Sequence, residues 1–170
     1  MKMPFRGFDE FPNEYFVESG SYLGDGIKAA LDAGFPNVIS IELTSKYYEH
    51  CKSRFRKDRR VTLVHGDTVQ VLWDIIRDID KPITFYLDGH FSGEDTGRGM
   101  MDYPLVQELK TIAVHPIKTH TLIIDDVRLF DIHWNLGTKT VMREIRRINK
   151  LYSVTFRNGY VEDDVLIAKV

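Results

Sequence analysis

Short runs of β-branched and aliphatic residues alternate along this chain with longer amphipathic segments, and no other feature constrains the fold as strongly. Residues 15–18, 37–43, 61–65, 83–88 and 121–125 have the composition of buried strands. Residues 24–33, 44–57, 68–79, 103–114 and 138–149 place apolar side chains at helical spacing. Strands that alternate with helices form right-handed βαβ units, so we expect a mostly parallel sheet.

The C-terminal part breaks this rhythm. Residues 152–157 and 165–170 read as two strands with no helix between them, around the turn-forming pair Asn158-Gly159. A strand pair joined in this way adds one antiparallel strand. We therefore predict an α/β fold, a Rossmann-like three-layer sandwich with a seven-stranded, mostly parallel sheet. A chain of 170 residues fits one hydrophobic core, so we expect residues 1–170 to form a single domain.

The charge balance limits the partners of the chain. Its formal net charge is −2, which argues against a protein whose main role is to bind the phosphate backbone of nucleic acids. No Asn/Asp-Pro-Pro-aromatic motif follows the fourth strand, so we expect no nucleic acid acceptor. The basic run at residues 52–60 is interpreted as the solvated end of a helix, the alternative being a docking patch for an anionic partner.

Cys51 is the only cysteine, which excludes an intramolecular disulfide and a multi-cysteine metal site. Its place in a predicted helix favours a structural thiol over a nucleophile. No apolar run approaches the roughly 18 residues that span a bilayer, and the N-terminal residues lack the apolar region of a secretory signal. We expect a soluble, cytoplasmic protein without a membrane partner.

A glycine-rich loop follows the first strand, where ligands bind in open α/β sheets. Its pattern is E-x-G-x-x-x-G-x-G, which differs from the dinucleotide pattern G-x-G-x-x-G and from the phosphate-binding loop. The glycines allow a sharp turn and a close approach of the backbone to a ligand. Turn chemistry alone is the alternative. The candidate ligand contacts are Glu18, Gly20, Ser21, Gly24 and Gly26.

Acidic residues end the next two strands. Glu42, about 20 residues beyond the loop, is placed to accept hydrogen bonds from ribose hydroxyls, unless it is an exposed residue at a helix start. Asp67, followed by Thr68, could accept from an adenine amino group or cap the next helix. For Glu42 and for Asp67, the ligand-binding role and the structural role both stay open.

Three carboxylates follow the fourth and fifth strands, namely Asp88 and the adjacent pair Asp125-Asp126. Like charges at one sheet edge repel unless a cation offsets them, and hard oxygen ligands suit Mg²⁺ or Mn²⁺. Helix and loop capping is the alternative. His90 is a candidate general base, substrate contact or surface histidine. His133 and Trp134 lie in the long loop after the fifth strand, which we expect to roof the site.

The order of strands, the glycine loop and these acids resemble class I S-adenosylmethionine-dependent methyltransferases from about Tyr15 to Val170. The resemblance implies that the loop from Glu18 to Gly26 faces the methionine part of the cofactor. It also implies that Glu42 holds the ribose and that the region of Asp67 and Thr68 meets the adenine. Without a metal, Asp88 would touch the cofactor or the acceptor.

A narrower resemblance is to metal-dependent O-methyltransferases of the catechol and macrolide-sugar types. It implies a metal held by Asp88, Asp125 and Asp126, which would bind two vicinal substrate oxygens and lower the pKa of one hydroxyl. Catechol-type enzymes place a lysine base three residues after the first acid, where this chain has Phe91, so His90 is the substitute. The N-terminal helices that often cover the substrate are missing, which implies an open pocket, a pocket completed by a second subunit, or a larger acceptor.

The predicted function is therefore metal-assisted O-methylation of a small hydroxylated molecule. A metal-free methyltransferase is the nearest alternative, and a non-catalytic S-adenosylmethionine-binding protein is the alternative from another class. A nicotinamide-dependent oxidoreductase is disfavoured, because the glycine spacing differs and no Tyr-x-x-x-Lys pair is apparent.

Overall fold

The computed structural model describes residues 5–90, 93, 97–131 and 137–170. The strands are β1 (Tyr15–Ser19), β2 (Asn37–Glu42), β3 (Val61–His65), β4 (Ile83–Leu87), β5 (Thr121–Ile124), β6 (Ser153–Arg157) and β7 (Val165–Lys169). The helices are η1 (Phe8–Glu10), α1 (Asp25–Asp32), α2 (Ser45–Phe55), α3 (Thr68–Ile76), α4 (Leu105–Val114), η2 (Val127–Leu129) and α5 (Thr138–Ile148). Over the described ranges, none of these helices has the length and apolar character that crossing a membrane requires.

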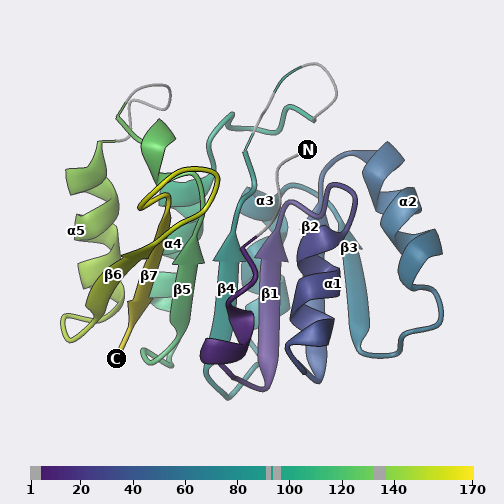
Figure 1. The fold of residues 1–170 in the computed structure, drawn as a ribbon, viewed down its shortest axis with the longest axis horizontal. Coiled ribbons are helices and arrows are strands. Elements are labelled where there is room, and N and C mark those ends of the chain that lie inside the picture. The colour runs from purple at the N-terminus through teal and green to yellow at the C-terminus, as the bar shows by residue number, and fades with distance from the viewer. Residues whose placement is uncertain (1–4, 91–92, 94–96, 132–136) are drawn as a thin grey trace.

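The seven strands form one sheet in the order β3-β2-β1-β4-β5-β7-β6 (Figure 1). Strands β1 to β5 pair in parallel, whereas β7 is antiparallel to both of its neighbours. The predicted α/β fold with one antiparallel strand is confirmed. The strand order reverses between β1 and β4, and the crevice outside the carboxyl ends of these two strands is where such sheets bind ligands.

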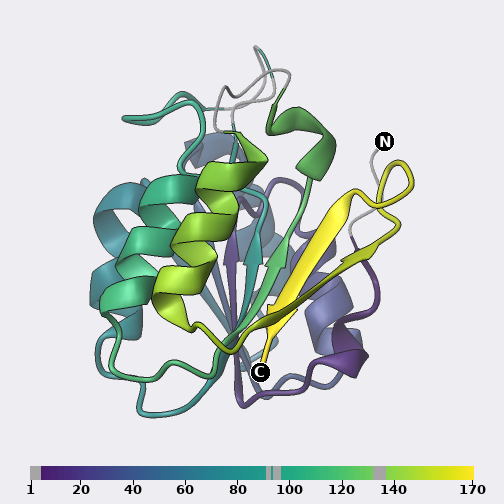
Figure 2. The same cartoon turned by 90° about the vertical axis from the view of Figure 1, so that its left-hand side faces the viewer.

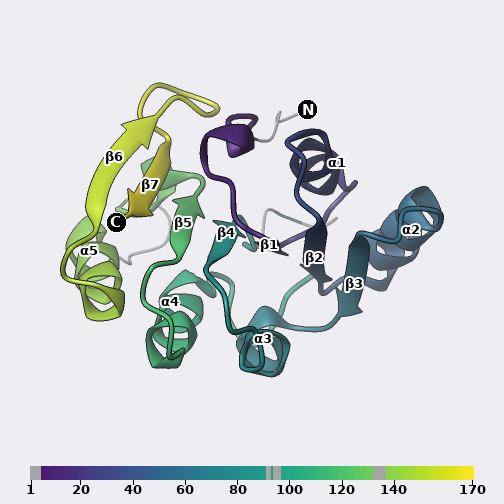
Figure 3. The same cartoon turned by 90° about the horizontal axis from the view of Figure 1, so that it is seen from below.

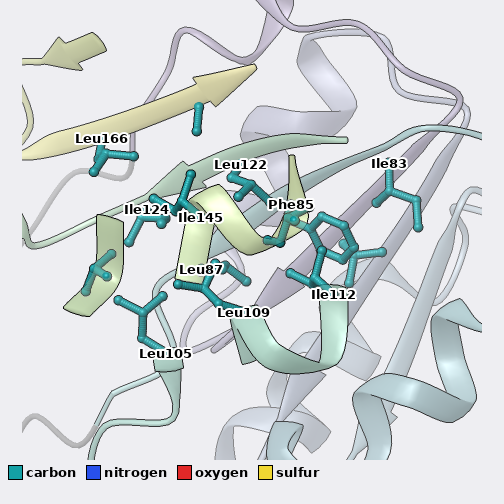
Figure 4. Close-up of a cluster of buried hydrophobic side chains, with 14 of the residues drawn as sticks. Ile83, Phe85, Leu87, Leu105, Leu109, Ile112, Leu122, Ile124, Ile145 and Leu166 are labelled. Atoms are coloured by element: carbon teal, nitrogen blue, oxygen red, sulfur yellow. The ribbon is translucent and has the colours of Figure 1, made fainter. Parts of the chain in front are cut away.

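Helices cover both faces of the sheet, as the view from below shows (Figure 3). One face packs against α3, α4 and α5, and its core is the larger of two buried clusters (Figure 4). The other face packs against η1, α1 and α2. Along β4, Phe85 and Leu87 face the first cluster and Tyr86 faces the second. This alternation favours apolar residues at most positions of the central strands, which is why they read as largely hydrophobic runs.

The N-terminal residues add an aromatic layer to the second cluster. The ring of Phe8 lies 5.0 Å from that of Phe16 on β1 and 5.1 Å from that of Tyr86 on β4, both in edge-to-face geometry. Such pairs add to the stabilisation from burial alone. The segment around η1 therefore anchors the two strands whose ends form the ligand crevice.

Candidate functional site

A cavity of about 970 Å³ lies at the carboxyl ends of the central strands. Its walls come from the segments that follow β1, β2, β3, β4 and β5. Nearly all predicted site residues line it: Glu18, Gly20, Ser21, Gly26, Glu42, Asp67, Thr68, Asp88, His90 and Asp126. Gly24 and Asp125 do not. The topology predicted from the sequence thus converges on one cavity.

Two glycines of the loop after β1 are required by close approach. A Cβ on Gly26 would lie 1.8 Å from Oε1 of Glu18, so the buried Glu18 side chain would have to move to admit any other residue. Gly20 has a φ of +86°, and a Cβ there would lie 3.1 Å from the carbonyl oxygen of Asp88. The loops after β1 and β4 therefore touch, and the glycines make room for this contact.

Glu18 lies beneath the loop in a buried hydrogen-bond network. Ser40 donates to Oε2 of Glu18 at 2.5 Å, and the hydroxyl oxygens of Ser40 and Ser21 are 2.6 Å apart. Burial raises the pKa of Glu18 to about 8, partly offset by the Ser40 bond and reinforced by the charge of Asp88. Glu18 is therefore mostly protonated at neutral pH, and it shapes the loop without adding a full charge.

Glu42 ends β2 and is 6% exposed, so it is not the exposed helix-start residue of the alternative interpretation. Its Oε2 accepts from the backbone amide of Tyr22 at 2.9 Å, and its Oε1 accepts from that of Thr44 at 2.7 Å. Each carboxylate oxygen has a second lone pair. Glu42 thus fixes the glycine loop and can still accept ribose hydroxyls.

Tyr22 is a cavity residue that the sequence analysis did not single out. Its φ of +46° is uncommon for a residue other than glycine, and its ring packs 4.6 Å from that of Tyr47. The thiol of Cys51, buried on α2, contacts its carbonyl oxygen at 3.3 Å. Burial raises the pKa of Cys51 to about 12, which fits the structural role predicted for this thiol.

Asp67 caps α3, because its Oδ1 accepts from the amide of Val69 at 3.0 Å. Its Oδ2 accepts from the amide of Met100 at 2.7 Å, which ties the segment before α4 to the end of β3. Thr68 donates to the buried Glu108 on α4 at 2.8 Å. The capping interpretation of Asp67 is confirmed, and the remaining lone pairs of its carboxylate leave a contact with adenine open.

Asp88, His90 and Asp126 meet at the other end of the cavity. Nδ1 of His90 lies 3.6 Å from Oδ1 of Asp88, and its Nε2 lies 3.3 Å from Oδ2 of Asp126. One ligand atom from each of the three side chains falls within 4.8 Å of the others. The imidazole therefore bridges the ends of β4 and β5.

Asp125 points elsewhere. Its Oδ2 accepts from the hydroxyl of Tyr86 at 2.7 Å, and its Oδ1 accepts from the amide of Asp126 at 2.8 Å. Asp126 has a left-handed backbone, with a φ of +60°. Asp125 and Asp126 still each place a carboxylate oxygen within 4.8 Å of the other and of Asp164, so these three buried acids form a second acidic cluster. The structure thus brings Asp126 together with Asp88 and His90 on one side and with Asp125 and Asp164 on the other.

Arg128 supplies a cation that the sequence analysis did not include. Its guanidinium lies 2.7 Å from Oδ1 of Asp126 and also pairs with the buried Asp164, which precedes β7. Its plane lies 5.0 Å from the centroid of the Tyr160 ring. The acidic end of the cavity is therefore partly neutralised by the protein itself. The pairing of Arg128 with Asp164 is seen only in the folded structure, because Asp164 is 36 residues away along the chain.

Three residues of the sequence analysis, Phe91, His133 and Trp134, lie outside the described residues. Their expected roles, the position of the missing lysine base and the roof of the site, stay predictions.

Comparison with known proteins shows relatives of the fold. No family model matches the sequence, and no curated protein matches it in sequence. A methyltransferase of Podospora anserina, PaMTH1, bound to S-adenosylhomocysteine, superimposes with a TM-score of 0.65 at 14% identity, over 95% of this chain and 74% of that one. The O-methyltransferase TomG from Streptomyces achromogenes, involved in tomaymycin synthesis and solved with S-adenosylmethionine, gives 0.64 at 13% identity, over 96% and 75%.

A spermidine synthase from Thermotoga maritima is similar to the same degree, with a TM-score of 0.65 at 14% identity, over 98% of this chain and 57% of that one. The chain therefore has the fold of class I S-adenosylmethionine-dependent methyltransferases, as its sequence predicts. Because the same fold also carries a spermidine synthase, the chemistry must be argued from the site.

Proposed function

We propose that this protein transfers the methyl group of S-adenosylmethionine to a hydroxyl of a small molecule, assisted by Mg²⁺ or Mn²⁺. The observation that carries the proposal is the cavity at the switch point, which has ribose-type and adenine-type acceptors at one end and an acidic, histidine-bridged pocket at the other. A cavity with two chemically different ends suits a cofactor bound at one end beside an acceptor molecule at the other.

The cofactor end is prepared by groups that are already held in place. Glu42 and Asp67 are each fixed by two backbone amides and keep lone pairs directed at the cavity. The glycine loop brings its backbone close to the methionine part, with the neutral Glu18 below it. Binding then costs little reorganisation, which favours affinity.

The donor set at the acceptor end fits a divalent cation. Two carboxylates and an imidazole nitrogen within 4.8 Å of one another suit Mn²⁺ as well as Mg²⁺, with water completing the shell. A cation held there by Asp88 and Asp126 would lower the pKa of an acceptor hydroxyl. Asp125, the third predicted ligand, accepts from Tyr86 and lies near Asp126 and Asp164, so it would join through a remaining lone pair or by exchanging its bond with Tyr86.

A metal-free methyltransferase is the second candidate, and the position of His90 favours it. With Nδ1 of His90 directed at Asp88, an unprotonated Nε2, 3.3 Å from Asp126, would be the nitrogen that accepts the proton of an acceptor hydroxyl as a general base. Arg128 already offsets part of the charge of Asp126. In a metal-free enzyme the carboxylate of Asp88 orients the His90 ring, and no cation is required beside it.

Isothermal titration with S-adenosylmethionine, with Mg²⁺ or with chelator, is the first experiment. Saturable one-site binding that Glu42→Gln weakens and Glu49→Gln leaves unchanged supports the cofactor site, because Glu49 is exposed on α2, pairs with Lys52 and does not line the cavity. Methyl transfer to a panel of catechols and sugar diols then tests the reaction. Loss of activity on addition of chelator supports a role for the cation. Activity that survives the chelator supports the metal-free methyltransferase. Binding of the cofactor without turnover supports a non-catalytic protein. No binding contradicts the proposal.

We expect the protein in the cytoplasm, since Cys51 is a buried thiol. A homo-oligomer in which a second copy covers the acceptor end also remains part of the proposal.

A further inference from the structure

The packed helices α4 and α5 carry exposed charge of one sign. Within residues 105–120 and 137–152, the acids Glu108 and Glu144 are each 1% exposed, and every accessible charged side chain is a cation. The cations are Lys110, Lys118, Lys139, Arg143, Arg146, Arg147 and Lys150. We call these seven cations the basic face. The net charge of −2 predicts no polyanionic partner, but it is the sum of the positive charge of the basic face and the more negative charge of the rest of the chain.

Some cations of the basic face form ion pairs or hydrogen bonds within the protein, and others do not. Arg143 and Arg147 pair with the buried Glu144, at 3.2 and 2.8 Å, and Arg146 donates to the backbone carbonyls of Lys150 and Tyr152. Backbone carbonyls do not cancel a charge, and one carboxylate offsets only one of the seven cations. The basic face therefore keeps a large excess of positive charge at neutral pH.

Two exposed aliphatic side chains adjoin the basic face. Val114, the last residue of α4, is 66% exposed, and Leu151, just after α5, is 77% exposed. Asn149 donates to the carbonyl of Lys118 at 2.9 Å, which joins the turn after α4 to the turn after α5. Each turn thus presents one aliphatic side chain and one lysine, and a shallow hollow lies between cationic side chains beside them.

Both turns lie at the end of the molecule opposite the cavity. Helices α4 and α5 return from the carboxyl edge of the sheet to its amino edge, so their C-terminal ends lie at the bottom (Figure 2). A protein bound to a surface through these turns would keep its cavity open to water.

We propose that the basic face and the two turns bind peripherally to an anionic lipid bilayer, with lipid phosphates at the lysines and arginines and with Val114 and Leu151 at the acyl boundary. Cations beside exposed aliphatic side chains are the pattern of interfacial membrane binding. Exposed aliphatic groups add nothing to contact with a phosphate backbone, so they favour a bilayer over a nucleic acid. The proposal is independent of the methyl-transfer chemistry.

Sedimentation with vesicles of equal parts phosphatidylcholine and phosphatidylglycerol tests this, beside pure phosphatidylcholine vesicles. Replacing Lys110, Lys118 and Lys150 together by Gln should lower partitioning by about five-fold per lysine, or roughly a hundred-fold, without disturbing the Glu144 pairs. The matched control replaces Lys28, Lys46 and Arg98 by Gln, three exposed cations outside both the basic face and the basic run at residues 52–60, which changes the net charge equally and should have little effect. Leu151→Ser should weaken binding several-fold, including at high salt, where electrostatic attraction is screened.

Equal losses in the two triple variants would overturn the proposal, since they would show attraction to net charge alone. Equal binding to both kinds of vesicle would overturn the role of the cations. Binding to a duplex RNA without binding to the anionic vesicles would replace the bilayer by a nucleic acid. Circular dichroism of each variant checks that the fold is retained.

Discussion

The hydroxyl of Tyr86 donates to Oδ2 of Asp125 at 2.7 Å, so a buried phenol on β4 holds the carboxylate that ends β5. Burial, with the charges of Asp88 and Asp125, raises the pKa of Tyr86 well above its ordinary value, so it stays a donor. The bond directs Asp125 into the protein while the adjacent Asp126 faces His90. Two neighbouring aspartates thus have different surroundings and, we expect, different roles.

Single substitutions separate these roles. Asp126→Asn removes a charge from the cation pocket and should weaken Mg²⁺ or Mn²⁺ binding about ten-fold or more. Asp125→Asn keeps an acceptor for Tyr86 and should leave cation affinity nearly unchanged. Isothermal titration with each metal measures both. Equal losses would mean that Asp125 leaves Tyr86 to bind the ion.

Gly26→Ala should destabilise the protein by about 1–3 kcal/mol, because its Cβ would lie 1.8 Å from Oε1 of Glu18. Affinity for S-adenosylmethionine should fall as the loop is displaced. In Glu18→Ala/Gly26→Ala the clashing carboxylate is gone, so the double variant should recover stability relative to Gly26→Ala. Urea unfolding measures this. A Gly26→Ala variant as stable as the parent would show that the Glu18 side chain moves away without cost.

Arg128→Gln should cost about 3 kcal/mol of stability, because it leaves the fully buried Asp164 without its charge partner. Arg128→Gln/Asp164→Asn should recover part of that loss. Arg98→Gln breaks an exposed ion pair with Asp102 and should change stability by less than about 1 kcal/mol. If Arg128→Gln is as mild as this control, solvent rather than Arg128 compensates Asp164.

The sequence predicts the sheet well, because the buried strands and amphipathic helices have different periods. It also predicts which residues meet at the cavity, since the carboxyl ends of parallel strands share one edge. Glu42 and Asp88 are found there for this reason alone, without knowledge of any side-chain conformation.

The orientation of side chains at that edge could not be predicted. The different partners of Asp125 and Asp126 depend on the left-handed backbone at Asp126 and on the Tyr86 hydroxyl. Arg128 is one basic residue among 23, and only the approach of the segment before β7 brings Asp164 to it. Tyr22 reads as an ordinary loop residue until its backbone is seen. These features depend on contacts between distant segments, which periodicity does not encode.

A chain of hydrogen bonds through two buried histidines closes the amino edge of the sheet. The amide of Ile83 donates to Nδ1 of His120 at 3.1 Å, so Nε2 of His120 carries the proton and lies 3.0 Å from Nδ1 of His115. Nε2 of His115 then lies 3.0 Å from the carbonyl oxygen of Ile76. The ring of His120 fits this chain only in the neutral state, because its Nδ1 must accept from the amide of Ile83.

Stability should therefore fall on acidification. Burial first, and then the charges of His115 and Lys118, lowers the pKa of His120 from 6.5 to about 3. Between these values the unfolded chain binds a proton that the folded protein does not, so the free energy of unfolding decreases as the pH falls from 6.5 towards 3, by up to about 1.4 kcal/mol per pH unit. Above 6.5 the contribution of His120 is constant.

Urea unfolding of the parent and of His120→Asn across this pH range measures the effect as a difference. Asparagine keeps an acceptor for the amide of Ile83 and does not titrate, so its stability should depend less on pH by about that amount. The control replaces the exposed His50 on α2 by Asn, and this variant should keep the slope of the parent. A His120→Asn variant with the slope of the parent would mean that His120 is already charged in the folded protein, and the hydrogen-bond chain could not then exist as described.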